Sequence, residues 1–421
     1  MKKVLGIILA VCWAAGAGTS AEGWVLDLSG LRHGPRQFLA IDKKEQSLLL
    51  FEQQSPLKLV RRYPCATGRS DGDKYIEGDL RTPEGVYFIE RNLSSGLDYD
   101  LFGEMALTLN FPNPVDRING KSGHGIWIHG RGQPIVPNET RGCIALNTAD
   151  LRHLKGQLQL GSTPVIIAQR VLWQPAQNVL DETSKRLATE VDAWAAAWQD
   201  KSERFFGYYD SERFSLSQTG SFSGFRRRKE RLFQDLSWIR THVSDLQLVP
   251  GPGYWVACFR QIYQSPHLAS EGVKRLYWMT DASGRWRIVG EEFRGLRASA
   301  ERAETAIDSS KVSEWVESWR AAWEEGNLQV YLSFYRDDAA QDARRGRSAI
   351  AGHKSRLWEK EKPKAIRFGP LDIKRHAQGI MVRFEQQYLG RSGYVDRGRK
   401  TLVVEPRGDS WLIIDEQWSA R

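Results

Sequence analysis

The chain has 421 residues, of which 41% are hydrophobic and 11% aromatic, with 60 Lys and Arg against 51 Asp and Glu. This length predicts two to four domains rather than one core, and the apolar content excludes a largely disordered protein. The net charge of +9 favours contact with anionic surfaces but does not indicate a particular chemistry.

Residues 1–21 have the pattern of a secretion signal. Lys2 and Lys3 precede an apolar run from Val4 to Ala17, and the small residues at 19–21 suit cleavage by a signal peptidase. An uncleaved anchor is the alternative, and no other stretch is long enough to cross a bilayer. We therefore expect a mature chain in the periplasm or cell envelope, where loss of the two lysines lowers the charge from +9 to +7.

The cysteines are odd in number once the signal is removed with Cys12. Cys65, Cys143 and Cys258 remain, so an oxidising compartment leaves at least one thiol free or intermolecular. A disulfide between Cys65 and Cys258 is one option, and two buried single cysteines are the other. One of the three thiols is therefore a candidate functional group.

Residues 36–168 have the pattern of a compact, mainly β domain. Two apolar runs around a polar turn predict a hairpin at 38–52. Further strands are predicted at 57–68, 86–89, 125–130 and 162–169. We find one helical signal, at 147–154, with Asn147 or Thr148 as its cap.

Residues 169–185 are predicted to link this domain to a tandem repeat. "VDAWAAAW" at 191–198 matches "VESWRAAW" at 316–323, and "FRQIY" at 259–263 matches "FEQQY" at 384–388, each with an offset of 125 residues. "KERL" at 229–232 and "KSRL" at 354–357, and the pair Trp286 and Trp411, share the same offset. This constancy predicts two copies of one domain, at 186–297 and 306–421.

Each copy begins with an amphipathic, tryptophan-rich helix and ends in β strands. Trp194 and Trp198 share a helix face, as do Trp319 and Trp323, and this spacing predicts core residues, with a ligand platform as the alternative. The order of elements resembles the α+β cone of nuclear-transport-factor-two-like (SnoaL-like) domains, which serve binding as readily as catalysis. The basic run "GFRRRKERL" at 224–232 is predicted to be a solvated helix face.

The segment "GIWIHGRGQPIVPNETRGCIAL" at 125–146 contains His129 and Cys143, and we considered three interpretations. A metal site needs three or four ligands and only His124 is close in sequence, so we expect no metal. A buried cysteine near a satisfied histidine is the second interpretation. The third is a nucleophile with its base, in which Arg141 favours the thiolate and the backbone N–H groups of Gly142 and Cys143 hold an oxyanion. The residues alone leave the last two open.

The motif "IHG…TRGCIAL" resembles the signature of the YkuD-type (ErfK/YbiS-like) L,D-transpeptidase family, His-Gly followed by Ser/Thr-x-Gly-Cys. "YPCATG" at 63–68 and "LRTPEGVYFI" at 80–89 are similar to neighbouring parts of the family. "LNFPNPVD" at 109–116 resembles a branch that includes cell-shape L,D-carboxypeptidases. The resemblance implies a mainly β, sandwich-like catalytic domain that acts on peptidoglycan and needs no cofactor.

The resemblance also implies roles for individual residues. Cys143 would be the nucleophile, His129 its base, Gly142 and Cys143 the oxyanion donors, and Arg141 a contact to substrate or oxyanion. Ala145 stands where many members carry an arginine that is linked to the donor carboxylate. Four further residues would line the substrate site: His124, Trp127, Gly130 and Thr140.

The implied reaction begins when Cys143 attacks the carbonyl that joins the diamino acid of a tetrapeptide stem to its terminal D-Ala, forming a thioester. An amine acceptor then gives a 3–3 cross-link or an attached envelope protein, and this transpeptidase outcome is our first expectation. Water instead gives an L,D-carboxypeptidase that trims tetrapeptide to tripeptide in cell-shape control. An envelope scaffold that works through its repeats is the second alternative. Expected partners are stem peptides, and for the repeats envelope proteins or anionic wall polymers; we expect no nucleic acid.

Overall fold

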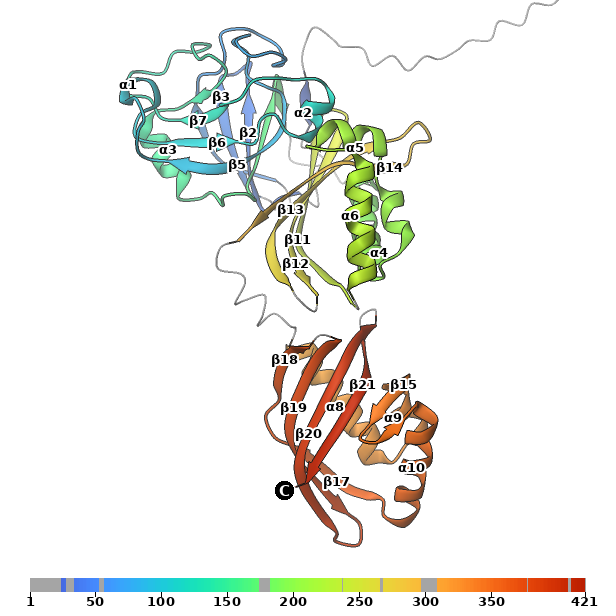
Figure 1. Ribbon diagram of the computed structural model, residues 1–421. Coiled ribbons are helices and arrows are strands. Elements are labelled where there is room, and N and C mark those ends of the chain that lie inside the picture. Colours follow the sequence, from blue (N-terminus) through green and yellow to red (C-terminus); the bar gives the residue numbers. More distant parts are fainter. Residues whose placement is uncertain are drawn as a thin grey trace, which may run out of the picture.

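The computed structural model in Figure 1 describes residues 24–27, 34–52, 57–173, 182–236, 238–265, 268–296, 309–376, 378–407 and 410–420. The predicted signal at 1–21, with Cys12, lies outside these residues. A mainly β domain lies at the top of Figure 1, followed by two α+β cones below it. The predicted fold class is confirmed.

An eight-stranded sheet forms the N-terminal domain, in the order β4-β3-β2-β9-β5-β6-β7-β8. Its strands are β2 (Gln37–Asp42), β3 (Ser47–Glu52), β4 (Lys58–Pro64), β5 (Gly85–Leu93), β6 (Ala106–Leu109), β7 (Trp127–His129), β8 (Ile144–Ala145) and β9 (Pro164–Ala168). The predicted hairpin is the antiparallel pair β2–β3, whose apolar runs are buried on both faces of the sheet, in two core clusters. The predicted strands at β5, β7 and β9 are confirmed, whereas the strand predicted over 57–68 ends at Pro64.

Three helices accompany this sheet where the sequence predicted one. The predicted helix is α3 (Thr148–Lys155), whose cap residue Asn147 makes no side-chain capping hydrogen bond. The others are α1 (Tyr99–Phe102), where Asp98 accepts hydrogen bonds from two backbone N–H groups, and α2 (Pro114–Ile118), which has a capping box. Both are too short to show a helical period in the sequence.

The segment predicted as a linker, 169–185, includes a strand and the start of a helix among its described residues. β10 (Arg170–Leu172) pairs in parallel with β1 (Val25–Asp27), and the buried N–H of Val171 donates to Asp42 Oδ2 at 2.9 Å. The helix α4 begins at Glu182. Strand pairing therefore continues past residue 168, the predicted end of the catalytic domain.

The first cone packs helices against a four-stranded antiparallel sheet (Figure 1). The helices are α4 (Glu182–Gln199), η1 (Glu203–Tyr208), α5 (Ser211–Ser217) and α6 (Phe222–Asp235), and the strands are β11 (Arg240–Gly251), β12 (Tyr254–Gln264), β13 (Ala269–Thr280) and β14 (Trp286–Gly295). Trp194 and Trp198 are 0% and 6% exposed, so both belong to the core as predicted.

The second cone repeats this plan with a larger sheet. Its elements are α8 (Ser309–Glu325), α9 (Leu328–Ser333), β15 (Tyr335–Gln341), β16 (Arg344–Arg345), α10 (Arg347–Lys360), β17 (Pro363–Phe368), β18 (Asp372–His376), β19 (Gly379–Gly390), β20 (Val395–Arg407) and β21 (Ser410–Ala420). The irregularity that leaves Val289 of β14 unpaired recurs at Ile414 of β21, so the offset of the sequence repeat is also structural. Trp319 and Trp323 are buried, as predicted.

The basic run at 224–232 lies on α6 and only part of it meets solvent. Arg227 and Arg228 are exposed, as predicted for a solvated face. Lys229 instead turns inward, with its Nζ 3.9 Å from the ring centroid of Trp198. Lys229 thus differs from the predicted solvated face, because its aliphatic stem packs against the indole and the ring attracts its ammonium group.

The N-terminal domain and the first cone share one hydrophobic core. Side chains of β5 such as Val86 pack in the same cluster as Val256 and Tyr254 of β12. The N–H of Val86 donates to Tyr254 Oη at 2.8 Å, and Asn113 Nδ2 approaches the same oxygen at 3.3 Å. The two bodies are therefore joined by buried contacts as well as by the chain.

Charge and shape reinforce this interface. Arg275, with a side chain 3% exposed, forms ion pairs with Glu90 of the N-terminal domain at 2.7 Å and Glu292 of its own cone at 3.0 Å. At Gly290, an added Cβ would lie 2.4 Å from Pro114 Cβ, which leaves room for no side chain. The first cone thus carries residues adapted to this contact.

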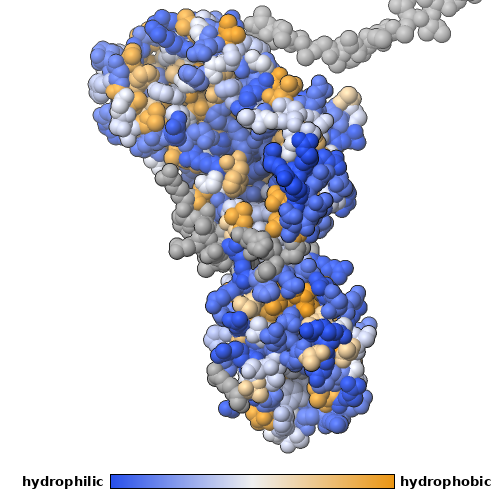
Figure 2. Space-filling model, in the orientation of Figure 1, coloured by the Kyte–Doolittle hydropathy of each residue, from blue (hydrophilic) through white to orange (hydrophobic). Residues whose placement is uncertain are grey.

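The surface seen in Figure 2 is predominantly hydrophilic, with hydrophobic side chains scattered over all three bodies. Among the described residues, no helix combines the length and apolar character that a membrane span requires.

Candidate active site

The pairing of β7 with β8 determines how His129 and Cys143 lie. The two strands are parallel, with His129 opposite Ala145. Side chains two residues apart on a strand share a face, so Trp127 lies on the face of His129. Cys143 lies in the bend immediately before β8, next to the residues that pair with Ile128 and His129. The pairing therefore brings the segments that carry the thiol and the imidazole side by side.

His129 is buried, and a backbone carbonyl fixes the position of its ring. It is 5% exposed, and its Nδ1 lies 2.6 Å from the carbonyl oxygen of Gly130. Because a carbonyl only accepts, this contact places the proton on Nδ1 and leaves the lone pair on Nε2. Burial lowers the pKa of His129, and the charge of Arg131 lowers it further, against the Gly130 hydrogen bond that raises it. The ring of Phe102 packs edge-on at 5.2 Å and fixes the imidazole plane.

Cys143 is half-buried and rests as a thiol. Its Sγ donates to the carbonyl oxygen of Gly125 at 3.4 Å. Burial raises the pKa of Cys143, while a hydrogen bond from the Trp127 backbone and the charge of Lys74 oppose that rise. Lys74, which the sequence analysis missed, is buried and donates to Asp79 Oδ1 at 2.8 Å. The thiol therefore has stabilising groups nearby but needs a base to lose its proton.

The turn before Cys143 depends on Gly142. Its φ is +125°, and an added Cβ would lie 2.7 Å from the carbonyl oxygen of Arg81. Its N–H, predicted as an oxyanion donor, donates to Thr140 Oγ1 at 3.1 Å. The Thr140 hydroxyl in turn donates to the carbonyl of Cys143 at 2.7 Å. Thr140 therefore holds the turn that presents the cysteine.

The remaining predicted residues divide into two groups. Trp127 is half-buried and packs on Phe102 with ring centroids 5.2 Å apart, beside the imidazole. Gly130 is buried, and an added Cβ would lie 3.0 Å from Thr148 Oγ1, so it serves close packing. His124 and Arg141 are exposed, where a ligand can reach them.

Ala145 explains one departure from the family pattern. It is 0% exposed and exchanges two backbone hydrogen bonds of 2.9 Å with Ala66. Its methyl group carries no charge and no hydrogen-bond donor. A contact to a donor carboxylate is therefore not available from residue 145.

The other cysteines have no catalytic character. Cys65 and Cys258 are both free and buried, and burial raises the pKa of each to about 12. The disulfide between them that the sequence left open is thus absent from the structure. In the described part of the chain, no group of three or more His, Cys, Asp or Glu side chains is placed to hold a metal ion.

Comparison with known families gives these features a context. Residues 36–167 match the L,D-transpeptidase catalytic domain family YkuD. Residues 186–292 and 311–417 each match the Cds6 C-terminal NTF2-like domain. The chain carries a YkuD L,D-transpeptidase domain and two Cds6 C-terminal NTF2-like domains.

Individual relatives cover parts of this arrangement. The L,D-transpeptidase domain is 32% identical over 99 residues to the putative L,D-transpeptidase YafK of Escherichia coli K12, a match that spans 23% of this chain and 39% of the relative. Among solved structures, the chain is similar to Bd1075 of Bdellovibrio bacteriovorus (25% identity, TM-score 0.48, covering 64% of this chain and 98% of that one). It is also similar to the helical cell shape determining protein Pgp2 of Campylobacter jejuni (24% identity, TM-score 0.47, 63% and 94%).

Proposed function

We propose that this protein acts on peptidoglycan stem peptides in the cell envelope, through a thioester on Cys143. The observation that carries the proposal is the parallel pairing of β7 with β8, which brings the segments that carry His129 and Cys143 side by side within an L,D-transpeptidase domain. The neutral, Nδ1-protonated imidazole supports it, because its Nε2 is free to accept a proton.

In the first half-reaction, His129 Nε2 takes the thiol proton while the sulfur attacks the carbonyl between the diamino acid and the terminal D-Ala. The N–H of Cys143 holds the developing oxyanion. When the C–N bond breaks, the amine of D-Ala takes the proton from His129 and leaves. Cys143 then carries the rest of the stem as a thioester.

In the second half-reaction, an amine or water attacks the thioester carbonyl. His129 accepts the proton of the attacking group and returns it to the departing Cys143 thiolate, which restores the resting pair. An amine acceptor forms a cross-link or an attached protein, and water yields the tripeptide. Each sequence of steps conserves protons and requires no oxidant, reductant or cofactor.

The surroundings of the thiol suit this cycle. A neutral thiol and imidazole become charged only when the substrate is attacked, and the Trp127 backbone and Lys74 favour the anionic sulfur at that moment. Gly142 and Thr140 hold the turn rigidly, so the sulfur is positioned before substrate binds. The alternatives are an L,D-carboxypeptidase in cell-shape control and a scaffold that works through its repeats.

The test is to incubate purified residues 22–421 with disaccharide tetrapeptide and identify the products by mass spectrometry. We expect a dimer linked between two diamino acids, or exchange of the terminal D-amino acid; tripeptide alone would identify the carboxypeptidase. Cys143→Ala and His129→Gln should abolish all products, whereas His376→Gln in the second cone should not. A lack of any Cys143-dependent product would reject the proposal and favour the scaffold.

A further inference from the structure

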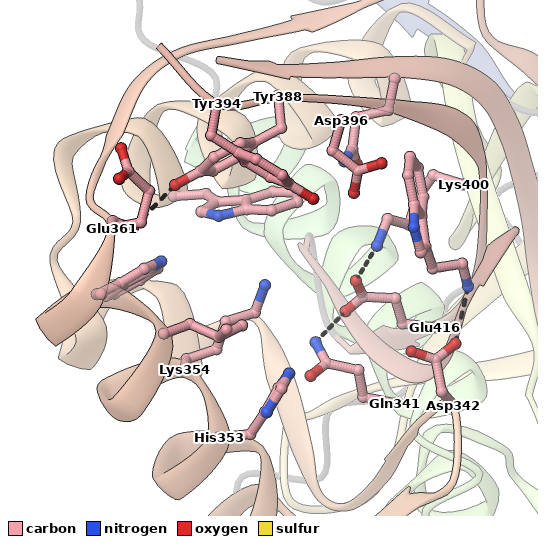
Figure 3. A pocket seen from close by; sticks show the side chains of 15 residues that line it. Gln341, Asp342, His353, Lys354, Glu361, Tyr388, Tyr394, Asp396, Lys400 and Glu416 are labelled. Carbon is pink, nitrogen blue, oxygen red and sulfur yellow. Dashed lines mark hydrogen bonds and ion pairs between the residues drawn. The ribbon is translucent and has the colours of Figure 1, made fainter. Parts of the chain in front are cut away.

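The second cone contains a cavity of about 240 Å³ whose lining includes none of the candidate catalytic residues (Figure 3). Its lining comes from α8, α10 and the strands β15, β19, β20 and β21. The volume is below that of pockets for drug-sized ligands, which begin at about 300 Å³. The cavity is therefore sized for a small metabolite.

Lys354, Lys400 and Glu416 are buried charges that meet in this cavity, and Asp342, Glu361 and Asp396 also line it. Lys354, Lys400 and Glu416 are 6%, 4% and 1% exposed. Glu416 is already engaged, because one oxygen pairs with Lys400 at 2.5 Å and the other accepts from Tyr335 at 2.5 Å. Lys354 lies over the ring of Trp323 at 4.1 Å, and in the described part of the chain its ammonium has no hydrogen-bond partner. Burial lowers the pKa of Lys354 to about 8, against the charge of Glu416.

Further polar atoms of the lining are buried without partners. Among the described residues, the side-chain oxygens of Gln341 and Gln386 find no donor, and Trp323 Nε1 finds no acceptor. A buried polar atom without a partner costs about 1–3 kcal/mol, so such atoms are normally paired. The complement to this set is an anion for Lys354 and Trp323, together with N–H or O–H donors for the two glutamine oxygens.

Aromatic rings form the remaining wall. Figure 3 shows the rings of Tyr388 and Tyr394 on the side of the cavity away from Glu416. Their centroids are 6.3 Å apart, and Tyr388 also packs on Trp323 at 6.4 Å. A ligand that fits both regions has a charged end at Lys354 and an apolar end at the tyrosines.

We propose that this cavity binds a small α-amino or α-hydroxy acid with an apolar side chain. The carboxylate pairs with Lys354, the amino or hydroxyl group donates to Gln341 and Gln386, and the side chain lies against Tyr388 and Tyr394. This binding site is separate from Cys143 and does not depend on the peptidoglycan chemistry proposed above.

The first cone provides a matched reference for this site. Lys229 occupies the position that Lys354 has in the second cone and lies 3.9 Å from Trp198. The rings of Phe205 and Phe225 lie 5.8 and 5.7 Å from its Nζ, so aromatic side chains surround it. In the second cone, Ile350 stands where the first has Phe225, and the smaller side chain leaves more space beside the lysine.

The first experiment titrates the full mature chain with phenylalanine in both enantiomers, by ligand-observed saturation-transfer NMR. Saturable binding is expected for at least one enantiomer and for 2-hydroxy-3-phenylpropanoate. Phenylalaninamide, which lacks the carboxylate, and 3-phenylpropanoate, which lacks the second donor, should each bind at least about ten-fold more weakly. The proposal would be overturned if the amide bound as tightly as the amino acid. It would also be overturned if no carboxylate in the series bound at roughly 10 mM, which is near the weakest Kd that such contacts give.

The second experiment uses matched variants. Lys354→Met should weaken binding at least about ten-fold, whereas Lys229→Met should leave it unchanged. Leu357, 44% exposed at the cavity, and its counterpart Leu232, 40% exposed, allow a test without a buried charge change. Leu357→Trp should block binding while Leu232→Trp should not. The proposed site would be refuted if Leu357→Trp still bound the ligand. It would also be refuted if only Lys229→Met and Leu232→Trp lost binding.

Discussion

The shared core between the L,D-transpeptidase domain and the first cone predicts a large effect of Tyr254→Phe. This change removes only the hydroxyl that accepts from the Val86 N–H at 2.8 Å. Tyr254 is 3% exposed, so water does not replace the lost acceptor. Asn113 keeps its second bond, to the Val86 carbonyl at 3.0 Å, so the main loss is one buried backbone donor. The free energy of unfolding should fall by about 1–3 kcal/mol.

Differential scanning calorimetry of the full chain measures this effect. For a unit of this size, 2 kcal/mol corresponds to roughly 4–8 °C in Tm. We expect one transition for the catalytic domain and first cone together, shifted by that amount, and a second transition for the other cone that stays unchanged. Tyr394→Phe, at a tyrosine that is 58% exposed, is the control. A shift below 1 °C, or separate transitions for the two joined bodies, would refute the reasoning.

Three further predictions concern the catalytic site. Burial raises the pKa of Cys143 and lowers that of His129. The rate at which iodoacetamide alkylates Cys143, followed by mass spectrometry, should therefore still increase at the pH where an ordinary thiol has ionised. A rate that levels off below pH 7 would contradict this. Lys74→Met should slow the same alkylation at each pH below the thiol pKa, since it removes a cation that favours the thiolate, and an unchanged rate would exclude that role. Gly142→Ala should destabilise the domain by about 1–3 kcal/mol or more and abolish turnover, because its φ of +125° and the Arg81 carbonyl at 2.7 Å both oppose a side chain. The control Gly156→Ala, at a φ of −62° with its nearest neighbour at 3.7 Å, should melt within a degree or so of the unchanged protein.

Features with a local signal were predictable from the sequence. The hairpin at 38–52 has two continuous apolar runs around a polar turn, and both strands bury them on both faces. Trp194 and Trp198 lie at helical spacing, as do Trp319 and Trp323, and all four are buried. The repeat was visible because core positions such as these keep their residue types at a constant offset.

Features that depend on distant contacts were not predictable. Lys74 lies near Cys143 because a β-bridge joins Gly68 to Thr140 and brings their two segments together. Neither segment contains a motif that predicts this contact. The parallel pairing of β1 with β10 joins opposite ends of the domain, so 169–173 looked like a linker. The inward turn of Lys229 and the cavity at Lys354 depend on which rings fill each cone, and a pattern of basic residues does not reveal that.

The absence of a side chain at Gly290 makes the two cones non-interchangeable. Asp415 occupies the corresponding position in the second cone, next to the same irregularity in its strand. In the place of the first cone, that carboxylate would meet Pro114, where even a Cβ lies at 2.4 Å. The first copy, with Gly290, therefore fits against the catalytic domain and the second does not, which fixes their order along the chain.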